Sequence, residues 1–497
     1  MMMKMTYRYL SCAVIGIALL LTSCKKLVDI DEPIDTVTSA KIFSSDEQAN
    51  QTLAGMYSQM VSSDGTLSML NGGATMYGGM AADELGLSNG VLFAEEQEIN
   101  SNKILVNNTV SESVLWMQTY KTIYTANAIL DGEAASTATT LTKVKRIELK
   151  ASSRFFRAFS FFYLTNFFGD IPLPLSSDYR KTIRLKRASR AEVYGQIIAD
   201  LKEAIILFSD PEAAAMSNTK ANKVAAQALL ARVYLYMQDW DNAENYANQV
   251  IANSAYKLEA LGHAFDPDSK ETVLQFRINP STNVGVINEM THFLPLVPLS
   301  FLSVSDQEFF LDPNNYPEFE TALIPRIAVM EQLVNAFEPD DQRKITWLNY
   351  NPSPIDAPYF GRKTYFANKY PNSEKDKTNY VLIRLAELHL IRAEARAMLN
   401  KISLAAEDID LIRNRAGLGK TAAANQQSLL NAIAQERRVE LFAEWGHRFF
   451  DLKRTGKAIL VLSAVPGKQG IRADDLLFPI PPVEILANSN LTQNPGY

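Results

Sequence analysis

The sequence predicts an all-α fold: a tetratricopeptide-like superhelix of helical hairpins that carries a large, irregular, loop-rich face. Three observations predict it, namely capped amphipathic helices, two related helix pairs and two long segments in which helical periodicity fails. The chain has 497 residues, more than a single domain usually holds. We therefore expect two lobes or one extended superhelix.

Helix starts and ends are marked at several places in the chain. Residues 44–47 read Ser-Ser-Asp-Glu, a capping box ahead of apolar residues at helical spacing. Residues 189–192, Ser-Arg-Ala-Glu, repeat this device before a second apolar stripe. The aromatic-rich run at 154–168 stops at Gly169, with prolines beyond it, which is typical of a helix end.

Two helix pairs share a common spacing. Ala231 and Ala243 are 12 residues apart, as are Ala393 and Ala405, so that a small residue lies on each helix where an antiparallel pair approaches closely. Such pairs cannot bury their faces alone and stack as a solenoid. Two more degenerate pairs are expected, at 147–168 with 189–207 and at 429–442 with 445–454.

Two segments lack helical periodicity. Residues 62–108 are rich in glycine, serine and asparagine, and residues 256–375 hold most of the prolines. Only short strands are predicted in this second segment, at 273–278 and 363–367. Long irregular segments within a compact protein are usually functional, so we expect the binding site there.

The N-terminus has the pattern of a lipoprotein signal. Lys4 and Arg8 precede an apolar run at 10–21, and small residues lead to Cys24. This run of 12 residues is shorter than the about 20 that a membrane-spanning helix needs. We predict a signal peptide at 1–23 and lipidation of Cys24. The alternative is an ordinary secretory signal with an incidental cysteine.

Cysteine usage favours lipidation. Cys12 lies inside the predicted signal and Cys24 is the other cysteine of the chain, so the exported protein has no disulfide partner for it. Residues 24–35 predict the lipidated cysteine and a flexible tether. The body is predicted at 36–497, with an N-terminal portion at about 36–220 and a C-terminal portion at about 221–497 that contains an irregular insertion at about 256–375.

The charge distribution excludes some classes of partner. The chain has a formal charge of −6, and no block of five or six like charges occurs in it. This pattern argues against nucleic acid as a partner and against an electrostatic hold on anionic lipid.

Catalytic motifs are not evident. The four histidines are scattered, and there is no HExxH, no GxSxG and no metal-spaced cluster in the sequence. We expect no enzyme and no cofactor or metal. Neighbouring carboxylates at Asp83-Glu84 and Glu95-Glu96 leave a surface glycosidase as an alternative, although sequence neighbours of this kind are more often solvated.

An ordered set of motifs resembles the SusD/RagB family of Bacteroidetes outer-membrane lipoproteins over essentially the whole mature chain. The motifs are the lipobox at Cys24, RFFRAFSFFYLTNFFGDIPLP at 154–174, RLAE at 384–387 with RAEA at 392–395, IRNRAG at 412–417, ERRVEL at 436–441 with WGHR at 445–448, and FPIP at 478–481.

The resemblance implies a non-catalytic nutrient-binding protein in the cell outer membrane, lipid-anchored and facing the exterior. It would capture oligosaccharides, or peptides in some branches, and would sit on a SusC-like TonB-dependent transporter. A scaffold whose only partner is protein is a further alternative. The ligand residues of the family vary with the ligand, so none is transferred to this chain by motif.

Charged motifs near the C-terminus are predicted to be structural. A network tying the last hairpins together is expected from Arg437, Arg438, Glu440, Glu444, Arg448 and Asp451. Three tryptophans fit packing positions, namely Trp116, Trp240 and Trp445.

A sugar site needs an exposed aromatic platform with polar groups around it. Trp347 and Tyr350, in the irregular insertion, are the candidates for this platform. The alternative for Trp347 is a core position beneath a loop, because tryptophan is highly buried on average. The glycine-rich segment offers a rim made of Asn71, Met76, Tyr77 and Asp83.

Overall fold

The computed structural model describes residues 42–61, 67–210, 217–278, 287–370 and 379–497. The predicted signal peptide, Cys24 and the predicted tether lie outside the described residues. Within the described ranges, no helix has both the length and the apolar character needed to cross a membrane.

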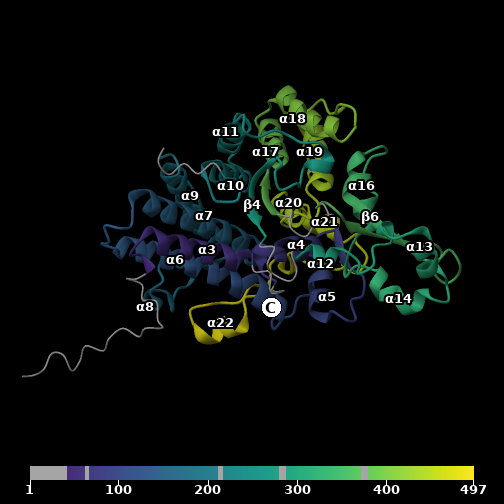
Figure 1. Cartoon of the computed structure of the whole chain (residues 1–497), viewed down its shortest axis with the longest axis horizontal. Helices are drawn as coiled ribbons and strands as arrows, with labels where there is room; N and C mark the ends of the chain where they lie inside the picture. The colour runs from purple at the N-terminus through teal and green to yellow at the C-terminus, as the bar shows by residue number, and fades with distance from the viewer. Residues whose placement is uncertain (1–41, 62–66, 211–216, 279–286, 371–378) are drawn as a thin grey trace, which may run out of the picture.

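Long helices form the N-terminal half of the molecule (Figure 1). The 26-residue helix α7 (Lys143–Phe168) packs between α6 (Gln118–Ala135) and α9 (Arg190–Leu207), and α3 (Asp46–Val61) contacts both α6 and α7. The capping box at the start of α9 is confirmed, because Ser189 and Glu192 each bond the other's backbone N–H. Gly169 ends α7 in the left-handed region, at φ 77°.

Helical hairpins stack beside this half. The first predicted pair is α10 (Lys223–Tyr236) with α11 (Trp240–Ile251), and the second is α17 (Leu385–Met398) with α18 (Ile402–Arg415). Their four matching alanines are fully buried, and α11 packs directly on α17. Figure 1 shows these helices together with α19 (Gln426–Glu440), which packs on α17 and α18. The predicted tetratricopeptide-like, mainly helical fold is confirmed.

Strands occur in four antiparallel pairs among the described residues. The strands predicted at 273–278 and 363–367 are confirmed as β4 and β7. The pairs are β1 (Leu85–Leu87) with β5 (Ile327–Val329), β2 (Ile171–Pro172) with β3 (Arg187–Ala188), β4 (Thr272–Arg277) with β8 (Asn379–Arg384), and β6 (Leu348–Pro352) with β7 (Lys363–Ala367).

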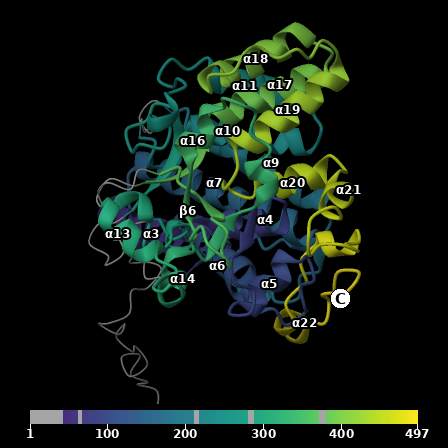
Figure 2. The same ribbon diagram turned by 90° about the vertical axis from the view of Figure 1, so that its right-hand side faces the viewer.

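The C-terminal insertion projects from the body as a separate lobe of short elements, seen at the right of Figure 1 and at the left of Figure 2. It contains α13 (Val304–Leu311) and α14 (Tyr316–Leu323), which share a small core of their own, and α16 (Gln342–Trp347) and the β6–β7 hairpin, which pack on the main core. Other short helices are α5 (Ala94–Asn100), α8 (Tyr179–Thr182), α12 (Met290–Phe293), α15 (Glu331–Val334), α20 (His447–Arg454), α21 (Ala458–Leu462) and α22 (Pro482–Ala487), with a π-helix at Val110–Met117 and 3-10 turns at Met69–Asn71, Leu261–His263, Leu299–Phe301 and Asp474–Leu476.

The glycine-rich segment differs from the expectation. Residues 73–81 form α4 (Gly73–Ala81), a completely buried helix, rather than an irregular surface loop. A Cβ on Gly78 would lie 2.6 Å from Cα of Gly446, which begins α20. Glycine is needed here because two backbones touch, and not because the chain turns. The predicted irregular structure is therefore wrong for this stretch.

Candidate functional site

The residues predicted to rim the site are in the core. Asn71, Met76, Tyr77 and Asp83 are all buried, on or beside α4. Asp83 accepts hydrogen bonds from Arg438 and Arg448, each at 2.7 Å. These four side chains are packed in the core and are not accessible to a ligand, so the prediction that they form a rim is wrong.

Trp347 is also a core residue. Its side chain ends α16 and is 1% exposed, and its Nε1 donates to the Leu261 carbonyl oxygen at 3.0 Å. The ring of Phe265 packs edge-on against it, at 5.7 Å between centroids. A ring in this position cannot stack on a ligand. The role as an exposed platform is wrong, and the alternative of a core position describes Trp347 correctly.

Tyr350 lies at the surface. Its side chain is 37% exposed on β6, directly opposite Tyr365 on β7, with 5.3 Å between ring centroids. Nζ of Lys363 lies 4.3 Å from the centroid of the Tyr350 ring. This hairpin therefore presents an aromatic pair with a cation beside it.

Further aromatic side chains are exposed close to this hairpin. Phe360, in the loop between β6 and β7, is 74% exposed, and Phe301, at the end of the 3-10 turn, is also exposed. Asn349 Nδ2 donates to Ser300 Oγ at 2.8 Å, which joins β6 to the segment of Phe301. We call the paired rings of Tyr350 and Tyr365 the aromatic face.

Phe301 and Phe360 were missed by sequence reasoning. Both lie in segments without periodicity, where an exposed and a buried phenylalanine look alike. The available signal was their position in the proline-rich insertion, which predicted the region but not the residues.

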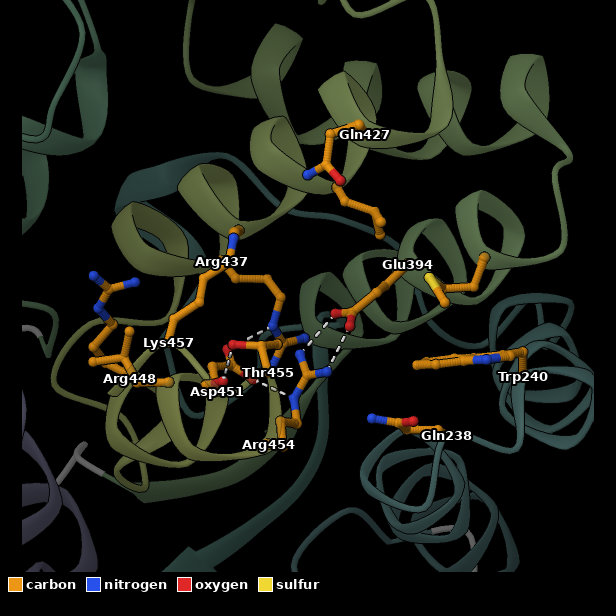
Figure 3. Close-up of a pocket in the computed structure, with 14 residues that line it drawn as sticks. Gln238, Trp240, Glu394, Gln427, Arg437, Arg448, Asp451, Arg454, Thr455 and Lys457 are labelled. Atoms are coloured by element: carbon orange, nitrogen blue, oxygen red, sulfur yellow. Dashed lines mark hydrogen bonds and ion pairs between the residues drawn. The ribbon is translucent and has the colours of Figure 1, made fainter. Parts of the chain in front are cut away.

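A second candidate is a cavity of about 300 Å³ between the helical hairpins and α20. Figure 3 shows Trp240 and Gln238 on one side of it, and Glu394, Arg454 and Asp451 on the other. Trp240 is half-buried and packs against the main core, which confirms its predicted packing role, while part of its side chain lines the cavity.

The charged groups of this cavity are engaged with one another. Arg454 donates to Glu394 at 2.5 and 2.7 Å and to Asp451 at 2.7 Å, and Arg437 also donates to Asp451 at 2.7 Å. Burial alone would raise the pKa of Asp451, but the two guanidinium groups outweigh it and hold that pKa well below its usual range. The polar groups of the cavity are thus largely committed to structure.

The predicted charge network is confirmed and is larger than expected. Arg384 is buried and pairs with Glu271 at 2.9 Å, Glu440 at 2.5 Å and Glu444 at 2.8 Å. Glu440 also forms ion pairs with Arg343 and Arg415, and Glu444 forms one with Lys369. A buried charge without partners is costly, so the network explains why charged residues are tolerated in this core.

The neighbouring carboxylates considered for glycoside hydrolysis have structural partners. Glu84 is completely buried, and this burial raises its pKa to about 8. Glu96 pairs with Arg326, and Glu95 accepts a hydrogen bond from Thr109. Across the described ranges, no group of three or more His, Cys, Asp and Glu side chains is placed to hold a metal ion.

Two family models match this chain. The model of the SusD family matches residues 350–497, and a model described as starch-binding and associating with the outer membrane matches residues 28–235. A SusD-like protein, P2, of Formosa agariphila is 27% identical over 435 residues, which cover 78% of this chain and 80% of that protein. The starch-binding protein SusD of Bacteroides thetaiotaomicron is 25% identical over 72% of this chain and 74% of its own length.

Solved structures show the same fold. A SusD superfamily protein from Bacteroides vulgatus has a TM-score of 0.72 at 21% identity, over 92% of this chain and 100% of that one. A laminarin-binding SusD-like protein has a TM-score of 0.70 at 24% identity, with the same two coverages. Together with the family models and the relatives, these likenesses place the chain: it belongs to the SusD/RagB family, whose members are non-catalytic binding proteins.

Proposed function

We propose that this protein is a cell-surface lipoprotein that captures oligosaccharides and delivers them to a SusC-like TonB-dependent transporter in the outer membrane. Its relatives include proteins named for binding starch and laminarin, and one of its family models is described as starch-binding and outer-membrane-associated. The observation on this chain that carries the proposal is the exposed aromatic face of the insertion. Capture needs only binding, without covalent chemistry.

The aromatic face suits a sugar on physical grounds. The CH faces of a sugar stack on aromatic rings, while its hydroxyls need hydrogen-bonding groups at the edge of the stack. Tyr350 supplies a ring and a phenolic hydroxyl, and Lys363 supplies a donor beside it. Phe360, on the loop, would extend the apolar surface along an oligosaccharide.

The cavity beside Trp240 fits a neutral sugar less well. Its arginines and carboxylates largely satisfy one another, with Nη1 of Arg437 the one buried arginine or carboxylate atom of the described lining left without a partner, so a ligand there would gain few new hydrogen bonds. We therefore place glycan capture on the aromatic face. The cavity then provides a control for the test of this placement.

The proposed protein is anchored to the outer membrane and passes its ligand to a transporter there. Residues 1–23 would be removed as a signal peptide, and residues 24–35 would form a lipid-anchored tether. A SusC-like transporter would receive the ligand. Co-purification of the lipidated protein with such a transporter from outer membranes tests this partnership.

The experiment is a thermal-shift and calorimetric screen of the mature chain against starch oligosaccharides, laminarin oligosaccharides and peptides. A ligand at about 100 times its dissociation constant stabilises the protein by roughly 2.7 kcal/mol, which a thermal shift detects readily. With a glycan that binds, we expect Tyr350→Ala to weaken binding about tenfold, the equivalent of roughly 1.4 kcal/mol of lost stacking. Trp240→Ala, the matched control, should bind as the wild type does.

Each other outcome has a clear meaning. If Trp240→Ala abolishes binding while Tyr350→Ala does not, the glycan site is the cavity. A response to peptides alone favours a peptide-binding lipoprotein of the same import system. Release of shorter sugars from the substrate would mean that the protein is a surface glycosidase.

A further inference from the structure

The chain around α8 is strongly basic in an otherwise acidic protein. Between residues 180 and 190 no side chain is acidic and six are basic, whereas the whole chain has a formal charge of −6. The six are Arg180, Lys181, Arg184, Lys186, Arg187 and Arg190. They are interrupted by other residues, so the sequence shows no continuous block and predicts no electrostatic hold on lipid.

Three of these cations are engaged within the protein. Arg180 pairs with Asp178 at 2.9 Å, Arg187 donates to the Asp170 carbonyl oxygen at 2.8 Å, and Arg190 lies over the ring of Tyr194 at 5.8 Å. The other three, Lys181, Arg184 and Lys186, are exposed, and their side chains make no hydrogen bond or ion pair with any residue that the structure describes.

Large apolar side chains are exposed among these cations. Tyr179 is 68% exposed, and Leu175 and Ile183 are exposed on the same segment. Leu486 of α22 is 86% exposed, and Tyr124 of α6 is exposed as well. Exposed apolar groups gathered in this way usually mark an interaction surface.

Specific hydrogen bonds bring these side chains to one side of the molecule. Tyr120 and Asn127 of α6 donate to the carbonyl oxygens of Pro172 and Pro174, and Tyr124 lies between them on the same helix face. Asn488 and Asn490, which follow α22, donate to the carbonyl oxygens of Leu185 and Arg184. In Figure 1, α6, α8 and α22 accordingly lie along the lower edge of the molecule.

We call this region the α8 surface, and define it by Tyr124, Leu175, Tyr179, Lys181, Ile183, Arg184, Lys186 and Leu486. We infer that the α8 surface rests on a lipid bilayer that carries anionic headgroups. Exposed lysines and arginines attract anionic lipid, while interspersed aromatic and aliphatic side chains enter the boundary between headgroups and acyl chains. A neutral or acidic protein surface would lack the complementary charge.

The chain enters the described structure close to this surface. The Phe43 carbonyl oxygen accepts a hydrogen bond from Ser136 at the end of α6, less than two helical turns from Asp131, which holds Ser176 and Ser177. The 18 residue-to-residue steps from Cys24 to Ile42 span at most about 65 Å. A membrane that holds the proposed anchor would thus lie within reach of the α8 surface.

The test is co-sedimentation of the mature chain carrying Cys24→Ser with lipid vesicles. This protein has no acyl chains, so any binding comes from its own surface, and a negative result leaves the proposed anchor and glycan capture untouched. We expect binding to vesicles of phosphatidylcholine mixed with phosphatidylglycerol, weakening as salt is added, and little binding to phosphatidylcholine alone. Each cation contributes roughly fivefold at a membrane surface.

The triple variant Lys181→Gln, Arg184→Gln, Lys186→Gln should therefore bind anionic vesicles about 100-fold more weakly. The control is a second triple variant in which the exposed Lys257, Lys270 and Lys420 become Gln, which removes the same charge elsewhere and should bind as the unsubstituted protein does. Tyr179→Ser with Ile183→Ser should weaken binding without changing its salt dependence.

Three results would overturn the inference. They are an absence of binding to anionic vesicles, an equal loss of binding in both triple variants, and a loss of transporter co-purification in the α8 variant while vesicle binding is unchanged. The last result would assign the α8 surface to a protein partner. Circular dichroism and a thermal melt of each variant establish that it is folded, so a loss of binding reports on the surface itself.

Discussion

Trp347 and Tyr350 are three residues apart and have opposite environments. Both are aromatic residues of the insertion, and the sequence supports either as a platform. The structure separates them because Trp347 turns inward at the end of α16 and bonds Leu261, whereas Tyr350 lies on the outward side of β6. Burial of one aromatic residue depends on how the hairpin packs on its neighbours, and no local pattern encodes this.

The contacts of buried ionisable groups are also only partly predictable from the sequence. The sequence predicted a charge network from Arg437 to Asp451, since the residues repeat on helical faces. It gave no sign that Glu289 is buried against Tyr380, with 3.0 Å between its carboxylate oxygen and the tyrosine hydroxyl. The two residues are 91 positions apart and meet only through tertiary packing.

The protonation of Glu289 makes stability depend on pH. Burial raises its pKa from 4.5 to about 8, so the folded state holds a proton that the unfolded state has released between these values. The contribution of this group is fully present below pH 4.5 and is lost as pH rises towards 8. Glu289→Gln mimics the protonated form, so relative to the wild type the variant should become progressively more stable by up to about 1.4 kcal/mol per pH unit across this range.

Urea unfolding at pH 5, 7 and 9 measures this relative gain, with the exposed Glu318→Gln as the matched control. A difference between Glu289→Gln and wild type that stays constant with pH would contradict the assignment of a protonated carboxyl to Glu289.

At the scale of elements, capped and periodic helices were predictable and α4 was not. The capping box of Ser189 and Glu192 is a local pattern that predicts the start of α9, and the repeated alanines predict the paired helices. In α4, glycines of low helix propensity suggested a loop. The gain from packing α4 against the start of α20 overrides this propensity, and that gain arises from contacts distant in sequence.

Gly78→Ala should destabilise the protein. The new Cβ would approach Cα of Gly446 to 2.6 Å, so the backbone of α4 or α20 must move, at a cost of roughly 1–3 kcal/mol. Gly55→Ala on α3 is the matched control, since nothing lies within 4 Å of its Cβ position. It should stabilise the helix by up to about 1 kcal/mol.

Chemical denaturation of both variants provides the measurement. Equal effects of the two substitutions would mean that the contact between α4 and α20 does not constrain residue 78.

At the scale of the whole molecule, the helical superhelix was predictable because each hairpin repeats a local pattern. The arrangement of the insertion relative to the repeats was not, since it depends on long-range pairs. Arg343 of α16, for example, contacts Glu440 of α19 at 3.1 Å across 97 positions. The location of the site in the insertion therefore stays a prediction, and of the side chains predicted to form the site Tyr350 is the exposed one.

Attachment to the membrane is a property of the whole molecule that one residue should control. Cys24→Ser removes the proposed acylation site, so the variant should no longer incorporate labelled palmitate, and a high-salt wash should release it from the outer-membrane fraction because only the α8 surface would then hold it there. Cys12→Ser, inside the signal peptide, is the matched control and should leave both properties unchanged. Retention of unlabelled Cys24→Ser after the high-salt wash would show that another part of the protein anchors it without acyl chains.

The charge network has a consequence for the conditions that the protein tolerates. Residues 42–497 contain no cysteine, so the long connections between the helical hairpins are closed by guanidinium–carboxylate pairs such as Arg232 with Glu387, at 2.6 Å and 155 positions apart. Burial disfavours ionised Glu440, but Arg415 and Arg384 outweigh this and hold its pKa below the usual range, so this stabilisation is lost as pH falls. Reducing agents leave such links intact, whereas acid opens them. The folded protein is thus indifferent to the redox state of its surroundings and responsive to their acidity.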